Sequence, residues 1–322
     1  MSRENRKRLL QLVILLVGLA AIAFAVVKTV NDTQEHVMPS PASIVVAGGF
    51  AIVAVLASAR AWVALFSDLV PTREDRAVLR GTLYLAQLTK YLPVGGVAQA
   101  ASQVTLARSV GVPLKRSTVA VPVSAIGAIA GAATLGAGLV FDTNLSGWVR
   151  LLALAGLSSV LLLRRQFMAR ALDLARRFVR RIPESDQLPT QSDIFMFYGW
   201  TTLTTAALCT GYSAMVYSLD PHVNPYTVFC AFAMSWVIGF IAVPIPAGVG
   251  IREVVLVALI PGVGTAPILA ASLVLRLLSI TAELLGFGVN RLVTMRHRMR
   301  AVDGGSRAPV DAAPPPEGRT AV

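Results

Sequence analysis

Charged residues are scarce in this sequence, and their scarcity excludes most soluble folds. Only 14% of the 322 residues are Asp, Glu, Lys or Arg, whereas 55% are hydrophobic. A soluble globular domain would carry about 25% charged residues. Several apolar runs reach the length of about 20 residues that a helix needs to cross a bilayer. The composition therefore indicates an all-α polytopic membrane protein.

Cysteine and histidine are almost missing, and so are the motifs of catalysis. Cys209 and Cys230 lie in apolar runs without the spacing of metal ligands, and the three histidines are scattered. The sequence contains no nucleophile motif, no histidine-based triad and no acidic metal cluster. We therefore expect no enzyme, no metal ion and no cofactor. The net charge of +12 is better explained by basic loops on one side of a membrane than by nucleic-acid binding.

The apolar runs predict seven membrane spans, and two interrupted segments between them raise the expected number to about seven or eight. A transmembrane domain is predicted over residues 1–298, and a disordered cytoplasmic tail over residues 299–322, which are rich in Pro and Gly. The predicted spans are 9–30, 42–66, 117–141, 148–163, 194–218, 226–243 and 266–290.

Arginine and lysine mark alternate ends of these spans. Basic residues precede the first span, follow the second, fill residues 164–181 and follow the last. The opposite loops, 31–41, 142–147 and 219–225, contain no Lys or Arg. By the positive-inside rule, both termini are expected in the cytoplasm of a multi-pass plasma-membrane protein.

Two segments break the apolar pattern with Pro and clustered Gly. Residues 91–96 read Tyr-Leu-Pro-Val-Gly-Gly, and residues 244–253 read Pro-Ile-Pro-Ala-Gly-Val-Gly-Ile-Arg-Glu. Broken backbone at membrane depth must be buried in protein or line a cavity, and such a pair of breaks points to a transporter binding site. The basic residues predict that the first segment enters and leaves on the cytoplasmic side and that the second completes a crossing. A Pro, a Gly two places later and a polar residue six places later occur in both, which suggests an internal repeat.

The second broken segment is a candidate lipid-phosphate site. Gly248 and Gly250 would let a phosphate approach the backbone at the start of a short helix, and Arg252 could bind it bidentately. Equally, the Pro and Gly residues could form a turn and nothing more, with Arg252 reaching to the interface. Beside the first break, Lys90 and Gln99 could line a path for a headgroup, although Lys90 could simply be an interfacial lysine.

Three charged residues form a candidate polar network. Arg276 falls near the middle of the last predicted span, and Glu283 follows on the same helical face. Seven residues separate them by about 10.5 Å, so each is expected to have another partner, with Glu253 the candidate for Arg276. Charges at this depth usually face a cavity or a partner. The alternative is a structural ion pair that fixes the helix register.

Two further patterns have two interpretations each. Residues 164–181 form an amphipathic, arginine-rich helix that is expected to lie in the headgroup plane, or they only set the topology. Gly127 and Gly131 have the spacing of close helix packing, which is expected within one chain rather than between two copies.

With these motifs, residues 9–295 resemble the lysylphosphatidylglycerol synthase transmembrane-domain family of flippase-like proteins. The resemblance rests on residues 89–99, on residues 244–253 and on the arginine-bearing last span. It implies lipid translocation, without the fused synthase domain that makes an aminoacylated lipid in the family's best-known members. Other members are associated with glycosyltransferases and polyprenyl-linked sugars.

The sequence thus predicts a plasma-membrane lipid flippase of the cell envelope. Its partner would be an aminoacyl-phospholipid or a polyprenyl-phosphate lipid, moved either passively or with proton coupling through Glu283. The alternative is a non-transporting membrane scaffold or accessory subunit for an envelope glycosyltransferase.

Overall fold

The described chain is all helical. The computed structural model describes residues 38–91, 95–141, 146–178, 187–241 and 251–305. These residues contain helices and connecting turns and no strand. The elements are α2 (Pro41–Ala64), α3 (Arg73–Leu88), η1 (Thr89–Tyr91), α4 (Gly95–Ser109), α5 (Leu114–Gly136), η2 (Ala137–Phe141), α6 (Gly147–Leu157), η3 (Ser158–Leu163), α7 (Arg165–Phe178), α8 (Gln191–Leu219), α9 (Pro225–Ile241), α10 (Ile251–Leu259) and α11 (Thr265–Gly305).

Three of these helices are long and apolar enough to cross a membrane. They are Pro41–Ala64, Leu114–Phe141 and Thr265–Thr294. A fourth crossing is added if the bent pair Gly147–Leu163 and Arg165–Leu174 counts as one span. The described residues therefore support three or four spans and not the expected seven or eight. Residues 9–30 lie outside the described residues, α8 is diluted by serine and threonine, and Pro225–Phe240 is short.

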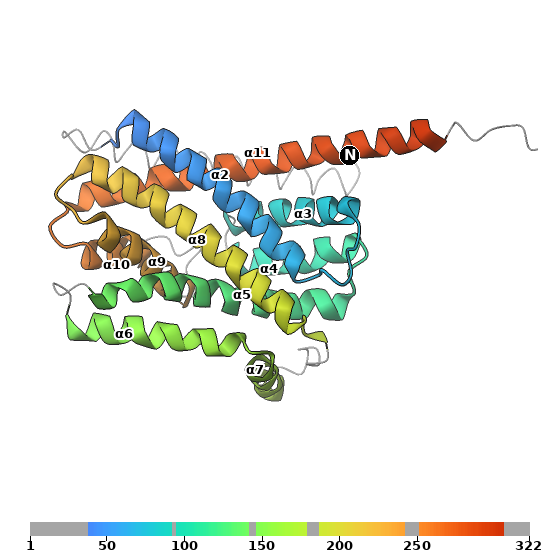
Figure 1. Cartoon of the computed structure of the whole chain (residues 1–322), viewed down its shortest axis with the longest axis horizontal. Helices are drawn as coiled ribbons and strands as arrows, with labels where there is room; N and C mark the ends of the chain where they lie inside the picture. The colour runs from blue at the N-terminus through green and yellow to red at the C-terminus, as the bar shows by residue number, and fades with distance from the viewer. Residues whose placement is uncertain (1–37, 92–94, 142–145, 179–186, 242–250, 306–322) are drawn as a thin grey trace, which may run out of the picture.

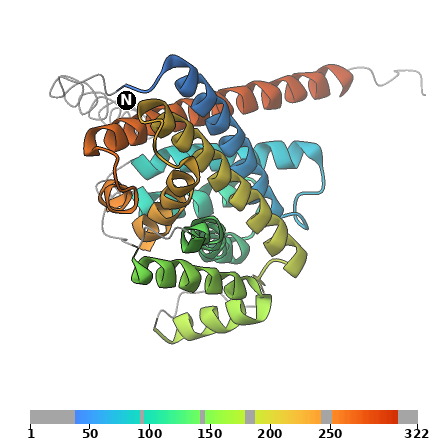
Figure 2. The ribbon, with the colours of Figure 1, turned by 60° about the vertical axis from the view of Figure 1, so that its left-hand side comes forward.

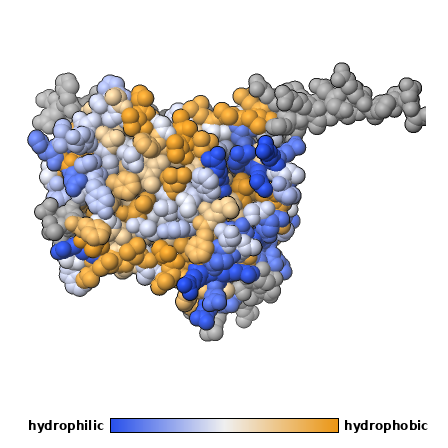
Figure 3. All heavy atoms as spheres, viewed as in Figure 1, coloured by the Kyte–Doolittle hydropathy of each residue, from blue (hydrophilic) through white to orange (hydrophobic). Residues whose placement is uncertain are grey.

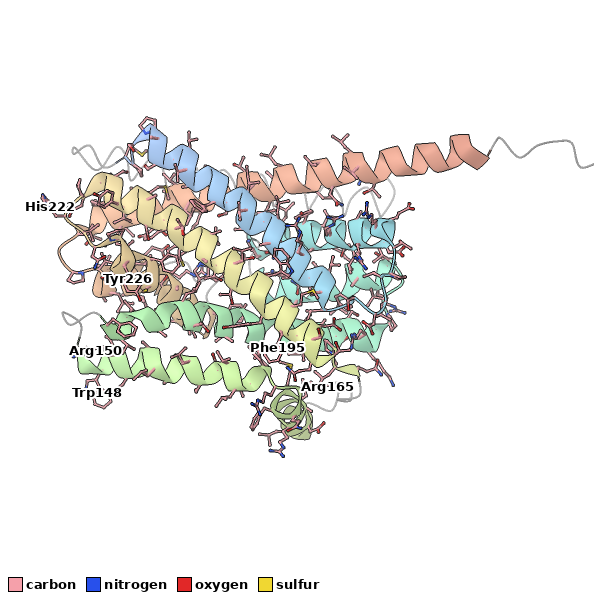
Figure 4. The ribbon with its side chains drawn as sticks, in the orientation of Figure 1. Trp148, Arg150, Arg165, Phe195, His222 and Tyr226 are labelled. Atoms are coloured by element: carbon pink, nitrogen blue, oxygen red, sulfur yellow. The ribbon has the colours of Figure 1, made fainter. Side chains whose placement is uncertain are left out.

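The helices run roughly along one axis, and their ends gather at two ends of the bundle. At one end, α2 finishes, α5 begins, and α7 lies across the bundle (Figure 1). At the other end lie Trp148, Arg150, His222 and Tyr226 (Figure 4). We call the first the α7 end and the second the Trp148 end. On the face shown in Figure 3, hydrophobic surface covers much of the region between the two ends, and hydrophilic surface gathers toward the α7 end.

The centre is built on close helix packing. The long helices α2 and α8 pack along each other, and a Cβ added at Gly211 on α8 would lie 3.2 Å from the Ala47 backbone. On α5, a Cβ at Gly131 would lie 3.3 Å from the Thr202 backbone of α8. Phe197 of α8 lies over Gly127 in the same way. The prediction that these two glycines pack within one chain is therefore confirmed.

Two short hairpins enter this bundle from opposite ends. The first, α3 and α4, begins and ends at the α7 end (Figure 1). The second, α9 and α10, begins and ends at the Trp148 end, because α9 follows the end of α8 there and α10 precedes the start of α11 (Figures 1 and 2). The expectation that the first segment returns to the end where it enters is confirmed, and its cytoplasmic side stays a prediction. The expectation that the second completes a crossing is wrong, because the 41-residue α11 crosses the bundle by itself.

Candidate functional site

The inner end of the first hairpin is tied to α11 by Lys90. This lysine, in η1, pairs with Glu283 of α11. Its Nζ also donates to Gln87 Oε1 at 3.2 Å, and Gln99 Nε2 donates to the same oxygen at 3.1 Å. Four polar side chains from η1, α3, α4 and α11 therefore form one hydrogen-bonded chain at the break.

Glu283 is the more buried member of this pair. Its side chain is 8% exposed, against 23% for Lys90. Among the described residues, no donor reaches its second carboxylate oxygen, Oε2, which is fully buried. A buried carboxylate is costly unless it is paired, and Lys90 supplies the cation that pairs with it.

The inner end of the second hairpin is tied to α11 by Glu253. Arg276 Nη2 donates to Glu253 Oε1 at 2.6 Å, and Ser272 Oγ donates to the same oxygen at 3.0 Å. The two charged side chains are 15% and 24% exposed, with Glu253 the more buried. The contact expected between Glu253 and Arg276 is present.

Arg252 lies beside this pair against α9. Its guanidinium carbon is 3.6 Å from the centre of the Trp236 ring. A Cβ at Gly239 would lie 2.7 Å from Cγ of Arg252, so only glycine lets the arginine pack this closely. This is a cation–π contact, which holds the guanidinium charge over the ring.

The described site residues thus form two groups, and each group is tied to α11. Arg276 and Glu283 are seven residues apart on α11, about 10.5 Å along its axis. Each has its own partner from a different hairpin, so the predicted network of Glu253, Arg276 and Glu283 is divided into two ion pairs. Gly248 and Gly250 lie outside the described residues.

Some residues of these groups were not among the predicted site residues. Ser272 supports Glu253, and Trp236 and Gly239 hold Arg252. Ser272 could have been found, because it lies four residues before Arg276 on the same helical face. Trp236 and Gly239 gave no signal, because their role depends on how α9 packs against α10.

The chain was compared with protein-family models, and none matches. No curated protein matches it either. Within the described ranges, no group of three or more His, Cys, Asp or Glu lies close enough together to hold a metal ion.

Proposed function

We propose that this chain is a lipid flippase, or flippase-like transporter, which moves a phosphate-bearing lipid across the plasma membrane. The single observation that carries the proposal is the pair of hairpins that enter from opposite ends, each bound at its inner end to α11 by an ion pair. The proposal includes six crossings, by residues 9–30, α2, α5, α6 with η3, α8 and α11, and the two hairpins make none. Both termini would lie in the cytoplasm, on the arginine-rich side.

Charged side chains within apolar helices support transport over a purely structural role. A helix that only anchors a protein gains nothing from an arginine and a glutamate near the bilayer midplane, because each costs at least a few kcal/mol there. Interrupted helices whose inner ends meet near the midplane are typical of transporter binding sites. The amide groups of Gln87 and Gln99 extend the polar surface at the first break. A lipid headgroup could cross between the breaks while its acyl chains stay in the bilayer.

Arg252 is the proposed phosphate ligand. It directly precedes Glu253 at the start of α10, where the helix dipole and unpaired N–H groups favour an anion. Gly248 and Gly250 are proposed to let the phosphate approach the backbone. Lys90 and Gln99 would contact the headgroup on the other side. An aminoacyl-phospholipid and a polyprenyl-phosphate lipid share the phosphate that this site would bind.

The first test is a lipid-transfer assay in vesicles that contain the purified chain. We expect the wild type to move a fluorescent phospholipid between leaflets and Arg252→Ala to lose most of this activity. Arg150→Ala is the control, since Arg150 lies at the Trp148 end (Figure 4) and has no part in either ion pair. Equal transfer by wild type and Arg252→Ala would contradict the proposal that Arg252 binds the lipid phosphate.

Native mass spectrometry of the same proteins would identify the lipid. One phosphate-bearing class should be enriched on the wild type and lost from Arg252→Ala. No transfer by the wild type, combined with binding of an envelope glycosyltransferase, would favour the scaffold function instead.

A further inference from the structure

Helix α7 is turned across the bundle, and the turn is fixed. The helices Gly147–Leu163 and Arg165–Leu174 meet at 90°. Gln191, the first residue of α8, spans this corner. Its side chain accepts a hydrogen bond from the Arg165 backbone N–H at 2.7 Å and donates to the Leu163 carbonyl at 3.1 Å. Two of the backbone groups left open by the bend are therefore satisfied, and α7 is held across the end of the bundle (Figures 1 and 2).

Only part of the apolar side of α7 packs on the rest of the protein. Met168 and Leu172, one turn apart, are buried against the bundle. Phe167 and Leu174, two turns apart on the adjacent line of the helix, are 41% and 55% exposed. Half of the apolar face therefore packs on the protein, and the other half forms an exposed stripe beside it.

Arginines lie beside this stripe and at the start of α7. Arg164, Arg165 and Arg170 are exposed, and the Arg170 guanidinium carbon is 5.9 Å from the Phe167 ring centre. Residues 164–181 contain seven arginines and a single acidic residue, Asp173. Such a helix presents aromatic and aliphatic side chains to acyl chains and guanidinium groups to headgroup phosphates. The hydrophilic surface near the α7 end in Figure 3 agrees with this composition.

We infer that α7 is a binding surface for anionic lipid headgroups, separate from the proposed transport site. The occupant is the negatively charged face of a bilayer. The exposed stripe matches its acyl chains, the arginines match its headgroups, and α7 lies across helices of membrane-spanning length. The inference does not rest on lipid transport. It needs only that the bundle is embedded in a membrane.

The first experiment counts the lipids retained by the full chain. The protein is placed in nanodiscs of phosphatidylglycerol and phosphatidylcholine, released gently, and its bound lipids are quantified by native mass spectrometry. We expect Arg165→Gln/Arg170→Gln to lower the retained ratio of anionic to zwitterionic lipid by about fivefold for each arginine removed. Arg150→Gln, at the Trp148 end, should leave the ratio unchanged. An unchanged ratio in the double variant, or an equal loss in the control, would overturn the inference.

The second experiment measures how deep the exposed stripe lies. Spin labels are placed at Leu174→Cys and Asp173→Cys, two neighbouring exposed positions on different sides of α7. In anionic nanodiscs, the label at position 174 should be accessible to oxygen and shielded from a water-soluble nickel chelate, and the label at 173 should show the reverse. Chelate access to both positions would mean that α7 faces water, which would overturn the inference whatever the transport assay shows.

Discussion

Both hairpins are tied to α11 by an ion pair, but the two ion pairs have opposite polarity. In the α3–α4 hairpin, the hairpin supplies the cation, Lys90, and α11 supplies the acid, Glu283. In the α9–α10 hairpin, the hairpin supplies the acid, Glu253, and α11 supplies the cation, Arg276. The supporting groups also differ. Amide side chains surround Lys90, whereas a serine supports Glu253, and an aromatic ring holds the neighbouring Arg252.

The difference shows which hairpin depends more on its ion pair. Glu283 is 8% exposed and has a carboxylate oxygen that no described group donates to, whereas Arg276 and Glu253 are 24% and 15% exposed, with Ser272 as an added donor. Removing one member of a buried pair leaves an uncompensated charge, and the cost falls as solvent reaches the site. The first hairpin should therefore be the more sensitive one.

The largest effect is expected when Lys90 is removed. Lys90→Met leaves Glu283 buried without its counter-charge, and we expect a loss of about 3–5 kcal/mol of unfolding free energy. The measurement is reversible unfolding in mixed detergent micelles. Lys90→Met/Glu283→Leu is the control, because it removes both charges and should recover much of the loss. A double variant as unstable as the single one would mean that packing, and not charge, sets the cost.

A smaller loss is expected at the second pair. Glu253→Gln keeps the shape of the side chain and removes the charge that faces Arg276, and we expect a cost of about 2 kcal/mol since both partners are partly exposed. The same unfolding assay compares it directly with Lys90→Met. A cost above that of Lys90→Met would reverse the ranking of the two hairpins.

The packing of Arg252 on Trp236 can be tested at Gly239. Gly239→Ala places a methyl group against the arginine stem, and we expect a loss of about 1.5 kcal/mol and a change in tryptophan emission. Gly199→Ala on α8 is the matched control, because a Cβ there meets nothing within 4 Å. Unchanged emission in Gly239→Ala would show that the arginine does not depend on this glycine.

The smallest expected effect belongs to Ser272. Ser272→Ala removes one hydrogen bond to Glu253, and we expect a loss of about 1 kcal/mol. Ser279→Ala on the same helix is the control, since its hydroxyl donates only to the Leu275 carbonyl of its own helix. Equal losses in both variants would mean that the serine contributes nothing specific to the second pair.

Much of this architecture could be predicted from the sequence, because apolar length and breaker residues are local signals. The helical class, the first returning segment and the Glu253–Arg276 contact followed from span length, basic residues and helical spacing. The direction of the second segment did not, because the positive-inside rule assumed that it had to supply a crossing, and α11 supplies it alone. The Lys90–Glu283 pair was not predicted either, since its members are 193 positions apart in the chain and no local pattern links them.

The length of α11 has a consequence for the membrane itself. Its apolar part, Thr265–Thr294, has 30 residues and is about 45 Å long, which exceeds a hydrocarbon core of about 30 Å. A helix with this hydrophobic mismatch tilts or thickens the surrounding bilayer, and the balance changes with bilayer thickness. Because Arg276 and Glu283 both lie on this segment, a change of tilt moves both anchoring points together. Acyl-chain length therefore becomes a physical variable that acts on the two hairpins at once.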